Sequence, residues 1–175
     1  MIDDEWIIVA FSDSDFGGDK ETRISIAGFI LYLMGVPISW RSKGMKSVTL
    51  SSSEAEYVAL SEAAREIKFV YQLLTGMGMK VKLPITVRVD NLGAIFMSEN
   101  VSVSQRTKHV DIRYRFVQEF VFDKFLKVIF VKTENNDSDI FTKNLGGDLY
   151  DHHSRKMIIE KGKCEMQSSS QQEGC

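Results

Sequence analysis

The sequence predicts a mixed α/β domain, because short apolar runs typical of strands are interspersed with segments of helical period. Three strand-like runs come first, and a helix, a strand, two helices, a strand and a last helix follow. With 175 residues and 43% hydrophobic content, the chain is long enough for one domain with a buried core. We expect this domain to span residues 1–160 and the polar tail, residues 161–175, to be disordered.

The first three strands are expected near the N-terminus. Residues 6–12 are an apolar run with aromatic and β-branched side chains, typical of a buried strand. Residues 24–34 and 36–42 form two further runs, which meet at Gly35. Because Pro37 cannot donate a ladder hydrogen bond, we expect the third strand to begin at a sheet edge or at a bulge.

A long helix is expected to follow and to end near Gly76 or Gly78. Its apolar positions recur at spacings of three and four, the stripe of a helix that packs on a core. Ser51, Ser52 and Ser53 are candidate N-caps of this helix, and Ser53 and Glu56 have the spacing of a capping box. The stripe consists of Tyr57, Leu60, Ala64, Ile67, Tyr71 and Leu74.

The second half of the chain predicts two more strands and three more helices. Residues 84–90 alternate between apolar and polar and form a strand that ends at Asp90. A short helix over residues 92–99 and a longer one over about 106–122 come next. Residues 124–132 form the last strand, and the segment DSDIFTKNL reads as the beginning of the last helix.

Charge and composition narrow the function classes only slightly. The net charge of −2 gives no global sign of a nucleic-acid partner. Basic residues do gather locally, and such groups are often simply solvated faces of a protein. One group contains Arg41, Lys43 and Lys46, and the other contains Arg106, Lys108, Arg113 and Arg115.

The N-terminal residues MIDDEW lack the basic and apolar regions of a signal peptide. No apolar stretch approaches the length of a membrane span. We therefore expect an intracellular protein, cytoplasmic or nuclear, that is not secreted and has no membrane partner.

Four acidic residues mark the ends of predicted elements: Asp13, Glu56, Asp90 and Asp139. Each of them alone has an ordinary explanation as a turn residue, a helix cap or a partner of the helix dipole. Carboxylates that converge from several elements repel one another, however, and usually hold a cation. Oxygen-only ligand sets suit magnesium, and two ions bridged by carboxylates make a phosphoryl-transfer site.

Three of these residues, Asp13, Glu56 and Asp139, have an acidic neighbour two positions away, and spacing helps to choose within each pair. Asp13 follows the buried strand more directly than Asp15, which suits a turn. Residues two positions apart on a helix point about 200° apart, so only one of Glu54 and Glu56 can face the sheet. We choose Glu56 and leave Glu54 as the partner of the helix dipole. Of Asp137 and Asp139, one is expected to be a cap.

Five motifs, in the order FSDSDFGGDKETR, SSSEAEY, VDNLGAI, RTKHVDIRY and DIFTKNL, resemble the ribonuclease H domain of copia-type LTR retrotransposon Pol polyproteins. The resemblance covers about residues 6–158. It implies a ribonuclease H-like fold, with a five-stranded mixed sheet of strand order 3-2-1-4-5 flanked by helices. Matched motif by motif, the catalytic and metal-binding residues are Asp13, Glu56, Asp90 and Asp139.

The resemblance also implies an activity, a cofactor and partners. The activity is hydrolysis of the RNA strand of an RNA–DNA hybrid with two Mg²⁺ ions, for which Mn²⁺ can substitute. The hybrid would be recognised by shape and 2′-hydroxyls rather than by sequence. The partners are this hybrid and the reverse transcriptase domain of the parent polyprotein, within a cytoplasmic virus-like particle or the nucleus. Residues expected to contact nucleic acid are Arg41, Lys43, Lys46, Asn91, Arg106, Lys108 and His109.

Two alternatives remain open. The first is a retrotransposon remnant that folds and binds nucleic acid without cleaving it. The second is a phosphatase with an Asp13-x-Asp15 nucleophile. That chemistry requires a Thr or Val soon after the pair and then a helix, whereas Phe16 and two glycines lead into a hairpin here.

Overall fold

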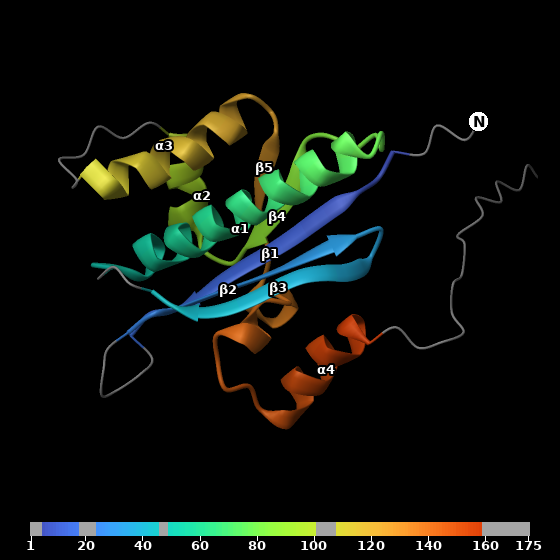
Figure 1. Ribbon diagram of the computed structural model, residues 1–175. Coiled ribbons are helices and arrows are strands. Elements are labelled where there is room, and N and C mark those ends of the chain that lie inside the picture. Colours follow the sequence, from blue (N-terminus) through green and yellow to red (C-terminus); the bar gives the residue numbers. More distant parts are fainter. Residues whose placement is uncertain (1–4, 18–23, 46–48, 101–107, 159–175) are drawn as a thin grey trace, which may run out of the picture.

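The computed structural model describes residues 5–17, 24–45, 49–100 and 108–158, with only the backbone for residues 108–112. These residues form a five-stranded mixed sheet with the order β3-β2-β1-β4-β5, as the resemblance implied (Figure 1). Strands β1, β2 and β3 are antiparallel neighbours, and β4 runs parallel to both β1 and β5. The strands are β1 (Ile8–Asp15), β2 (Ile26–Leu33), β3 (Val36–Gly44), β4 (Ile85–Val89) and β5 (Leu126–Phe130).

Helices cover both faces of the sheet (Figure 1). Helices α1 (Ser52–Gly76), α2 (Leu92–Glu99) and α3 (Lys108–Phe122) lie on one face. On the other face lie the short 3-10 helix η2 (Asp139–Phe141), which contacts β1 and β2, and the last helix α4 (Gly147–Met157). A second 3-10 helix, η1 (Thr133–Asn135), follows β5.

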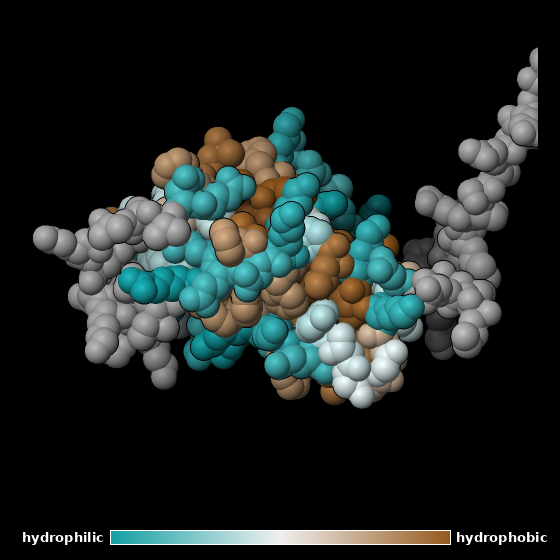
Figure 2. Space-filling model, turned by 90° about the horizontal axis from the view of Figure 1, so that it is seen from above, coloured by the Kyte–Doolittle hydropathy of each residue, from teal (hydrophilic) through white to brown (hydrophobic). Residues whose placement is uncertain are grey.

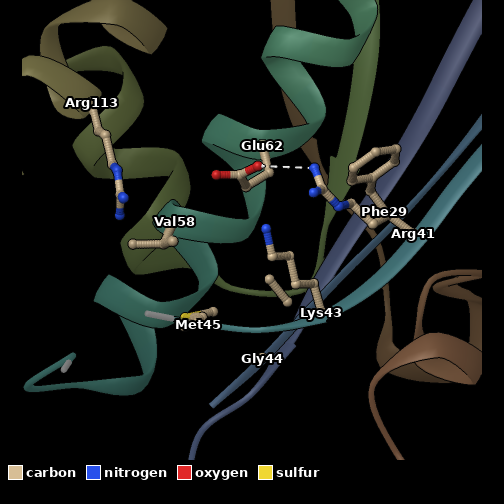
Figure 3. Close-up of a pocket in the computed structure, with 9 residues that line it drawn as sticks. Phe29, Arg41, Lys43, Gly44, Met45, Val58, Glu62 and Arg113 are labelled. Carbon is tan, nitrogen blue, oxygen red and sulfur yellow. Dashed lines mark hydrogen bonds and ion pairs between the residues drawn. The ribbon is translucent and has the colours of Figure 1, made fainter. Parts of the chain in front are cut away.

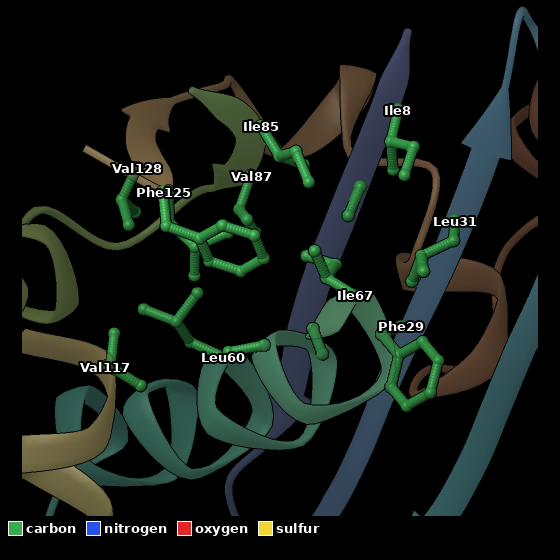
Figure 4. Packing of buried hydrophobic residues seen from close by; sticks show 14 of the residues in the cluster. Ile8, Phe29, Leu31, Leu60, Ile67, Ile85, Val87, Val117, Phe125 and Val128 are labelled. Carbon is green, nitrogen blue, oxygen red and sulfur yellow. The ribbon is translucent and has the colours of Figure 1, made fainter. Parts of the chain in front are cut away.

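The main hydrophobic core lies between α1 and the sheet (Figure 4). The predicted stripe of α1 faces this core, with Tyr57, Leu60, Ala64, Ile67 and Leu74 buried and Tyr71 packed against them. Because strand residues alternate between faces, neighbouring residues of β1 and β2 point to the other side. There Phe11, Ile30 and Tyr32 form a smaller cluster.

Strand β3 forms one edge of the sheet, as Pro37 predicted. Its register with β2 shifts between Leu31 and Tyr32, and Tyr32 is the partner of Pro37. A proline is tolerated at such a place because the edge needs no second ladder of hydrogen bonds.

Of the three candidate N-caps Ser51 is confirmed, whereas the capping box of Ser53 and Glu56 does not form. The Ser51 side chain caps α1 by accepting a hydrogen bond from the Glu54 amide at 3.1 Å. Glu54 in turn accepts from the Leu50 amide at 2.8 Å. Ser51 and Glu54 thus cap the helix two residues before the expected pair, which leaves the Glu56 side chain available for contacts with the sheet.

Two predicted boundaries were also wrong. Strand β1 extends through Asp15 because β2 continues to pair with it, so Asp13 lies inside the strand, opposite Gly28. The segment DSDIFTKNL contains only the 3-10 helix η2, and the last helix begins later, at Gly147. Asn136 accepts hydrogen bonds from both the amide and the hydroxyl of Ser138, and such local side-chain bonds compete with a regular helix.

Seen from above, the surface mixes hydrophilic residues with hydrophobic patches (Figure 2). The exposed large hydrophobic residues include Phe69 and Leu73 of α1 and Met77, the C-cap residue of this helix, which follow one another at spacings of four. Among the described helices, none has the length and apolar character needed to cross a bilayer. The predicted disordered tail lies outside the described residues.

Candidate active site

Three of the four predicted carboxylates converge. Asp13 of β1, Glu56 of α1 and Asp90, which follows β4, each offer an oxygen atom, and these atoms lie within 4.8 Å of one another. Asp13 and Glu56 are buried, whereas Asp90 is half-buried. This acidic triad has the donor set and the spacing of a divalent-metal site.

The fold brings the triad together through two neighbouring parallel strands and one helix. Strands β1 and β4 are parallel and adjacent, so their carboxyl ends lie at the same edge region of the sheet. Glu56 comes from the first turns of α1, where its Oε1 accepts hydrogen bonds from the amide and the hydroxyl of Ser14, each at 3.0 Å. Asp90 Oδ2 accepts from the Thr133 hydroxyl at 2.8 Å. Glu56 and Asp90 are thus each oriented by a neighbouring side chain or amide.

The fourth predicted residue, Asp139, is joined to Asp13 through a lysine. Lys143 Nζ lies 3.1 Å from Asp13 Oδ1 and 3.2 Å from Asp139 Oδ1. Thr142 donates its hydroxyl hydrogen to Asp13 Oδ2. Sequence reasoning missed both Thr142 and Lys143, although the four-residue spacing of Asp139 and Lys143 within DIFTKNL was a signal for an ion pair.

The turn that carries Asp139 is held on the sheet by a close approach and by polar contacts. A Cβ atom on Gly28 would lie only 2.6 Å from Thr142 Cγ2 and 3.0 Å from Phe141 Cβ, so β2 needs glycine at this position. The Ser42 hydroxyl donates to the Phe141 carbonyl at 2.6 Å. The Asn136 side-chain amide donates to the Ser12 carbonyl at 3.1 Å, which ties the turn to β1.

Burial of the carboxylates and repulsion between them favour binding of protons or cations at this site. Burial raises the pKa of Glu56 to about 9, and the charges of Asp13 and Asp90 add to the shift. Burial and the charge of Asp13 raise the pKa of Asp139 to about 7. Burial also raises the pKa of Asp13, although Lys143 and Thr142 oppose this change. A divalent cation would relieve the repulsion that these shifts express.

One oxygen of the site has no hydrogen-bond partner among the described residues. Glu56 Oε2 is buried in this state, while Oε1 takes both bonds from Ser14. A buried carboxylate oxygen without a partner is costly, and coordination of a cation would satisfy it. The residues of the triad therefore fit a hard divalent ion.

Two of the residues predicted to contact nucleic acid, Arg41 and Lys43, line a pocket between the β2–β3 edge and α1 (Figure 3). Its volume is about 90 Å³. Arg41 Nη1 lies 3.4 Å from Glu62 Oε2, and Figure 3 shows Lys43 and Arg113 directed toward the space beside this glutamate. Arg113 comes from α3, so the pocket joins two residues of the first predicted basic group with one residue of the second.

Of the other residues predicted to contact nucleic acid, the structure describes the side chain of Asn91 only. Asn91 caps α2, since its Oδ1 accepts hydrogen bonds from the Ala94 amide and the Ser53 hydroxyl, each at 3.1 Å. Lys46 and Arg106 lie outside the described residues. Lys108 and His109 begin α3, but the description of this helix does not include their side chains.

Solved structures with the same fold define the class of this chain. A ribonuclease H1 named LC11, whose structure was determined in complex with an RNA/DNA hybrid, superposes with a TM-score of 0.57 at 14% identity and covers 77% of this chain and 92% of its own. The N-terminal ribonuclease H domain of rv2228c from Mycobacterium tuberculosis gives a TM-score of 0.51 at 12% identity, with 86% and 98% coverage. The strand order and the helices thus define a ribonuclease H-like fold.

Sequence comparison identifies the family, although no family model matches the chain. The retrovirus-related Pol polyprotein from transposon RE2 of Arabidopsis thaliana is 36% identical over 152 residues, which are 87% of this chain. The corresponding polyprotein from transposon TNT 1-94 of Nicotiana tabacum is 38% identical over 137 residues, 78% of the chain. This chain belongs to the ribonuclease H-like domains of copia-type Pol polyproteins, and it spans about 10% of the length of these relatives.

Proposed function

We propose that this domain is a metal-dependent endoribonuclease that cleaves the RNA strand of RNA–DNA hybrids. The observation that carries the proposal is the convergence of Asp13, Glu56 and Asp90, with their oxygens within 4.8 Å of one another, on a ribonuclease H-like fold. Carboxylates that are buried together repel one another and lower stability. Such a cluster is therefore typical of a functional site that binds cations.

The cofactor we propose is a pair of Mg²⁺ ions, with Mn²⁺ as a substitute, held by Asp13, Glu56, Asp90 and Asp139. When bound, such ions supply an activated water and neutralise charge on the scissile phosphate. The chain itself supplies the orientation. Ser14 holds one oxygen of Glu56 and leaves the other for the site, and Thr133 holds one oxygen of Asp90. Asp13 is the most central carboxylate, since it belongs to the triad and also shares Lys143 with Asp139.

The pocket of Arg41, Lys43 and Arg113 is our candidate for a contact with the DNA-strand backbone. Its cations project beside α1, the helix that also carries Glu56, and Glu62 lies about 9 Å farther along the axis of this helix. A volume of about 90 Å³ admits a group the size of a few water molecules, which suits a phosphate. Lys46, Asn91, Arg106, Lys108 and His109 would extend this surface, and the reverse transcriptase of a parent polyprotein would be a second partner.

Cleavage of a labelled RNA–DNA hybrid in Mg²⁺ tests the activity. We expect the chain to cut the RNA strand and Asp90→Asn to reduce the rate by about 100-fold or more, since removal of an electrostatic contact in a transition state costs this much. If the native chain cuts no faster than the variant, the enzyme proposal fails. Binding of the hybrid without any cleavage would favour the alternative, a retrotransposon remnant that folds and binds nucleic acid but does not cleave it.

A second assay tests the pocket. Lys43→Gln should weaken hybrid binding and reduce its dependence on salt, because each phosphate contact releases counterions. Lys127→Gln is the matched control, since Lys127 is also exposed on an edge strand but belongs to β5, at the opposite edge of the sheet. Equal effects of the two substitutions would exclude the pocket as a specific contact.

A further inference from the structure

Among the described residues that contact the predicted quartet, Lys143 carries the opposite charge. Its ammonium group lies almost equally far from Asp13 Oδ1 and Asp139 Oδ1, at 3.1 and 3.2 Å. This is where a cation shared by these two carboxylates would have to lie. Two cations cannot occupy one place between the same pair of oxygens, so lysine and metal must compete for it.

The surroundings of Lys143 keep its side chain charged. Burial alone would lower the pKa of this lysine, but the charges of Asp13 and Asp139 outweigh burial and raise the pKa above its usual value. The ammonium group therefore remains a full positive charge at the site.

We propose that Lys143 is a positioning residue that serves as an internal counter-ion and makes the two metal positions of the site unequal. The inference rests on the metal pair of the proposed function. The Asp13–Glu56–Asp90 triad takes the first divalent ion while Lys143 stays in place. An ion shared by Asp13 and Asp139 binds only when it displaces the Lys143 ammonium group, and this exchange weakens its affinity.

The structure allows this displacement without unfolding. The Lys143 side chain is 32% exposed, so its end can move from the two carboxylates into solvent. Its backbone stays anchored, because the Lys143 amide donates to the Asp139 carbonyl at 2.9 Å. The Thr142 hydroxyl continues to hold Asp13 from the other oxygen. The exchange thus requires rotation of one flexible side chain.

Binding of Mn²⁺, followed by the paramagnetic resonance of the free ion, tests the proposal without any need for cleavage. We expect the native chain to bind one ion more tightly than a second. Lys143→Gln should strengthen the second binding step by about tenfold (about 1.4 kcal/mol), because the ion then no longer has to displace a partly exposed lysine from its ion pairs with Asp13 and Asp139. Lys143→Arg retains the charge and should leave the second step weak.

Lys156→Gln is the matched control. Lys156 also pairs with a buried carboxylate, since its Nζ lies 2.8 Å from Asp137 Oδ1, and its side chain is similarly exposed at 39%. Both Gln variants should lose some thermal stability in chelator, but only Lys143→Gln should change ion affinity. An unchanged or weakened second step in Lys143→Gln, in a folded protein, overturns the proposal.

A measurement on the native chain covers the case in which Lys143→Gln does not fold. Side-chain ammonium resonances of lysine can be followed by NMR during a Mg²⁺ titration. The Lys143 resonance, identified through its own side-chain carbons, should shift with the second ion, whereas that of Lys156 should not. A Lys143 resonance that stays constant to saturation overturns the proposal. If the ions bind as described but no hybrid is cut, the proposed function fails and this inference stands.

Discussion

The two faces of the sheet are held by different forces. Helix α1 covers one face with an extended apolar core, in which Leu60 and Ile67 are fully buried (Figure 4). On the other face, a small apolar cluster is supplemented by the buried carboxylate of Asp137. This group accepts a hydrogen bond from the Tyr32 hydroxyl at 3.2 Å and lies 3.0 Å from His153 Nδ1.

The site draws on both faces. Glu56 is placed by the helix that packs on the apolar core, whereas Asp139 is placed by the turn that polar contacts hold on the other face. Apolar packing is non-directional and tolerates local adjustment, but hydrogen bonds are directional and fail when geometry changes. We therefore expect substitutions on the apolar face to cost mainly stability, and substitutions on the polar face to affect mainly the Asp139 side of the site.

The largest effect on stability is expected for Leu60→Ala in the apolar core. The substitution should lower the free energy of unfolding by about 2–5 kcal/mol, because it removes buried methyl groups and leaves a cavity. Leu73→Ala on the same helix is the control, since Leu73 is 52% exposed and should change stability by less than about 0.5 kcal/mol. Urea unfolding gives both values, and similar losses for the two variants would contradict the assignment of the core face.

Asp137→Asn tests the polar face next. It retains the shape of the side chain but removes the charge that Lys156 and Tyr32 contact, so we expect a loss of about 1.5–3 kcal/mol. Asp148→Asn in the exposed first turn of α4 should cost less than about 1 kcal/mol. Binding of the first metal ion should not change in either variant. A large loss of first-ion affinity in Asp137→Asn would show that the two sides of the site are not separable.

Gly28→Ala probes the close approach between β2 and the turn of Asp139. The added Cβ would clash with Thr142 Cγ2, and we expect a loss of about 1–3 kcal/mol in the free energy of unfolding, together with weaker binding of the second ion. Thr142→Ser removes the clashing methyl group but keeps the hydroxyl that Asp13 accepts.

The double variant Gly28→Ala, Thr142→Ser should therefore recover part of the loss in a double-mutant cycle. Gly76→Ala is a further control, because its Cβ would meet nothing within 4 Å. Strictly additive losses from Gly28→Ala and Thr142→Ser would contradict the proposed contact.

The smallest expected effect is the dependence of the free energy of unfolding on pH, which arises from the buried carboxylates of the site. The pKa of Glu56 rises from its ordinary 4.5 to about 9 in the folded chain, and that of Asp139 rises from 3.8 to about 7. The folded state therefore keeps protons that the unfolded state has released, so in chelator the free energy of unfolding should fall as the pH rises from about 4 to about 9.

Bound Mg²⁺ replaces these protons, so in Mg²⁺ the free energy of unfolding should decrease less as the pH rises than it does in chelator. Urea unfolding in chelator and in Mg²⁺, at several values of pH, provides the comparison. Glu56→Gln should reduce the fall, most clearly above about pH 7, where the folded native chain still keeps the Glu56 proton. Stability in chelator that rises over this range would contradict the raised pKa values.

Local patterns predicted the element types well and the element ends less well. The helical stripe of α1 and the alternation in β4 were sufficient for their elements, since each period reflects a single buried face. The end of β1 was misjudged because pairing with β2 extends the strand beyond its apolar run. The last helix was misplaced because the side chains of Asn136 and Ser138 bind locally and favour a 3-10 turn.

The candidate site also has a part that local patterns predicted and a part that they did not. Asp13, Glu56 and Asp90 could be chosen from their positions along the chain and from the motifs around them, and the structure brings them together. Arg41 and Arg113 belonged to separate basic groups in the sequence, and only the fold places them in one pocket. Lys143 was not chosen at all, because a lysine that follows a predicted helix start is most often a solvated surface residue.

The sequence by itself determined the series of strands and helices, the helical stripe that packs on the sheet, and the acidic residues of the ribonuclease H-like motifs. These features are local, since each depends on the period or the type of residues close together in the chain. The tertiary structure alone decided that Lys143 lies between Asp13 and Asp139, and that Gly28 makes room for Thr142. Such contacts join residues that are far apart in the chain, so they depend on how the turn packs against the sheet and not on any pattern within either segment.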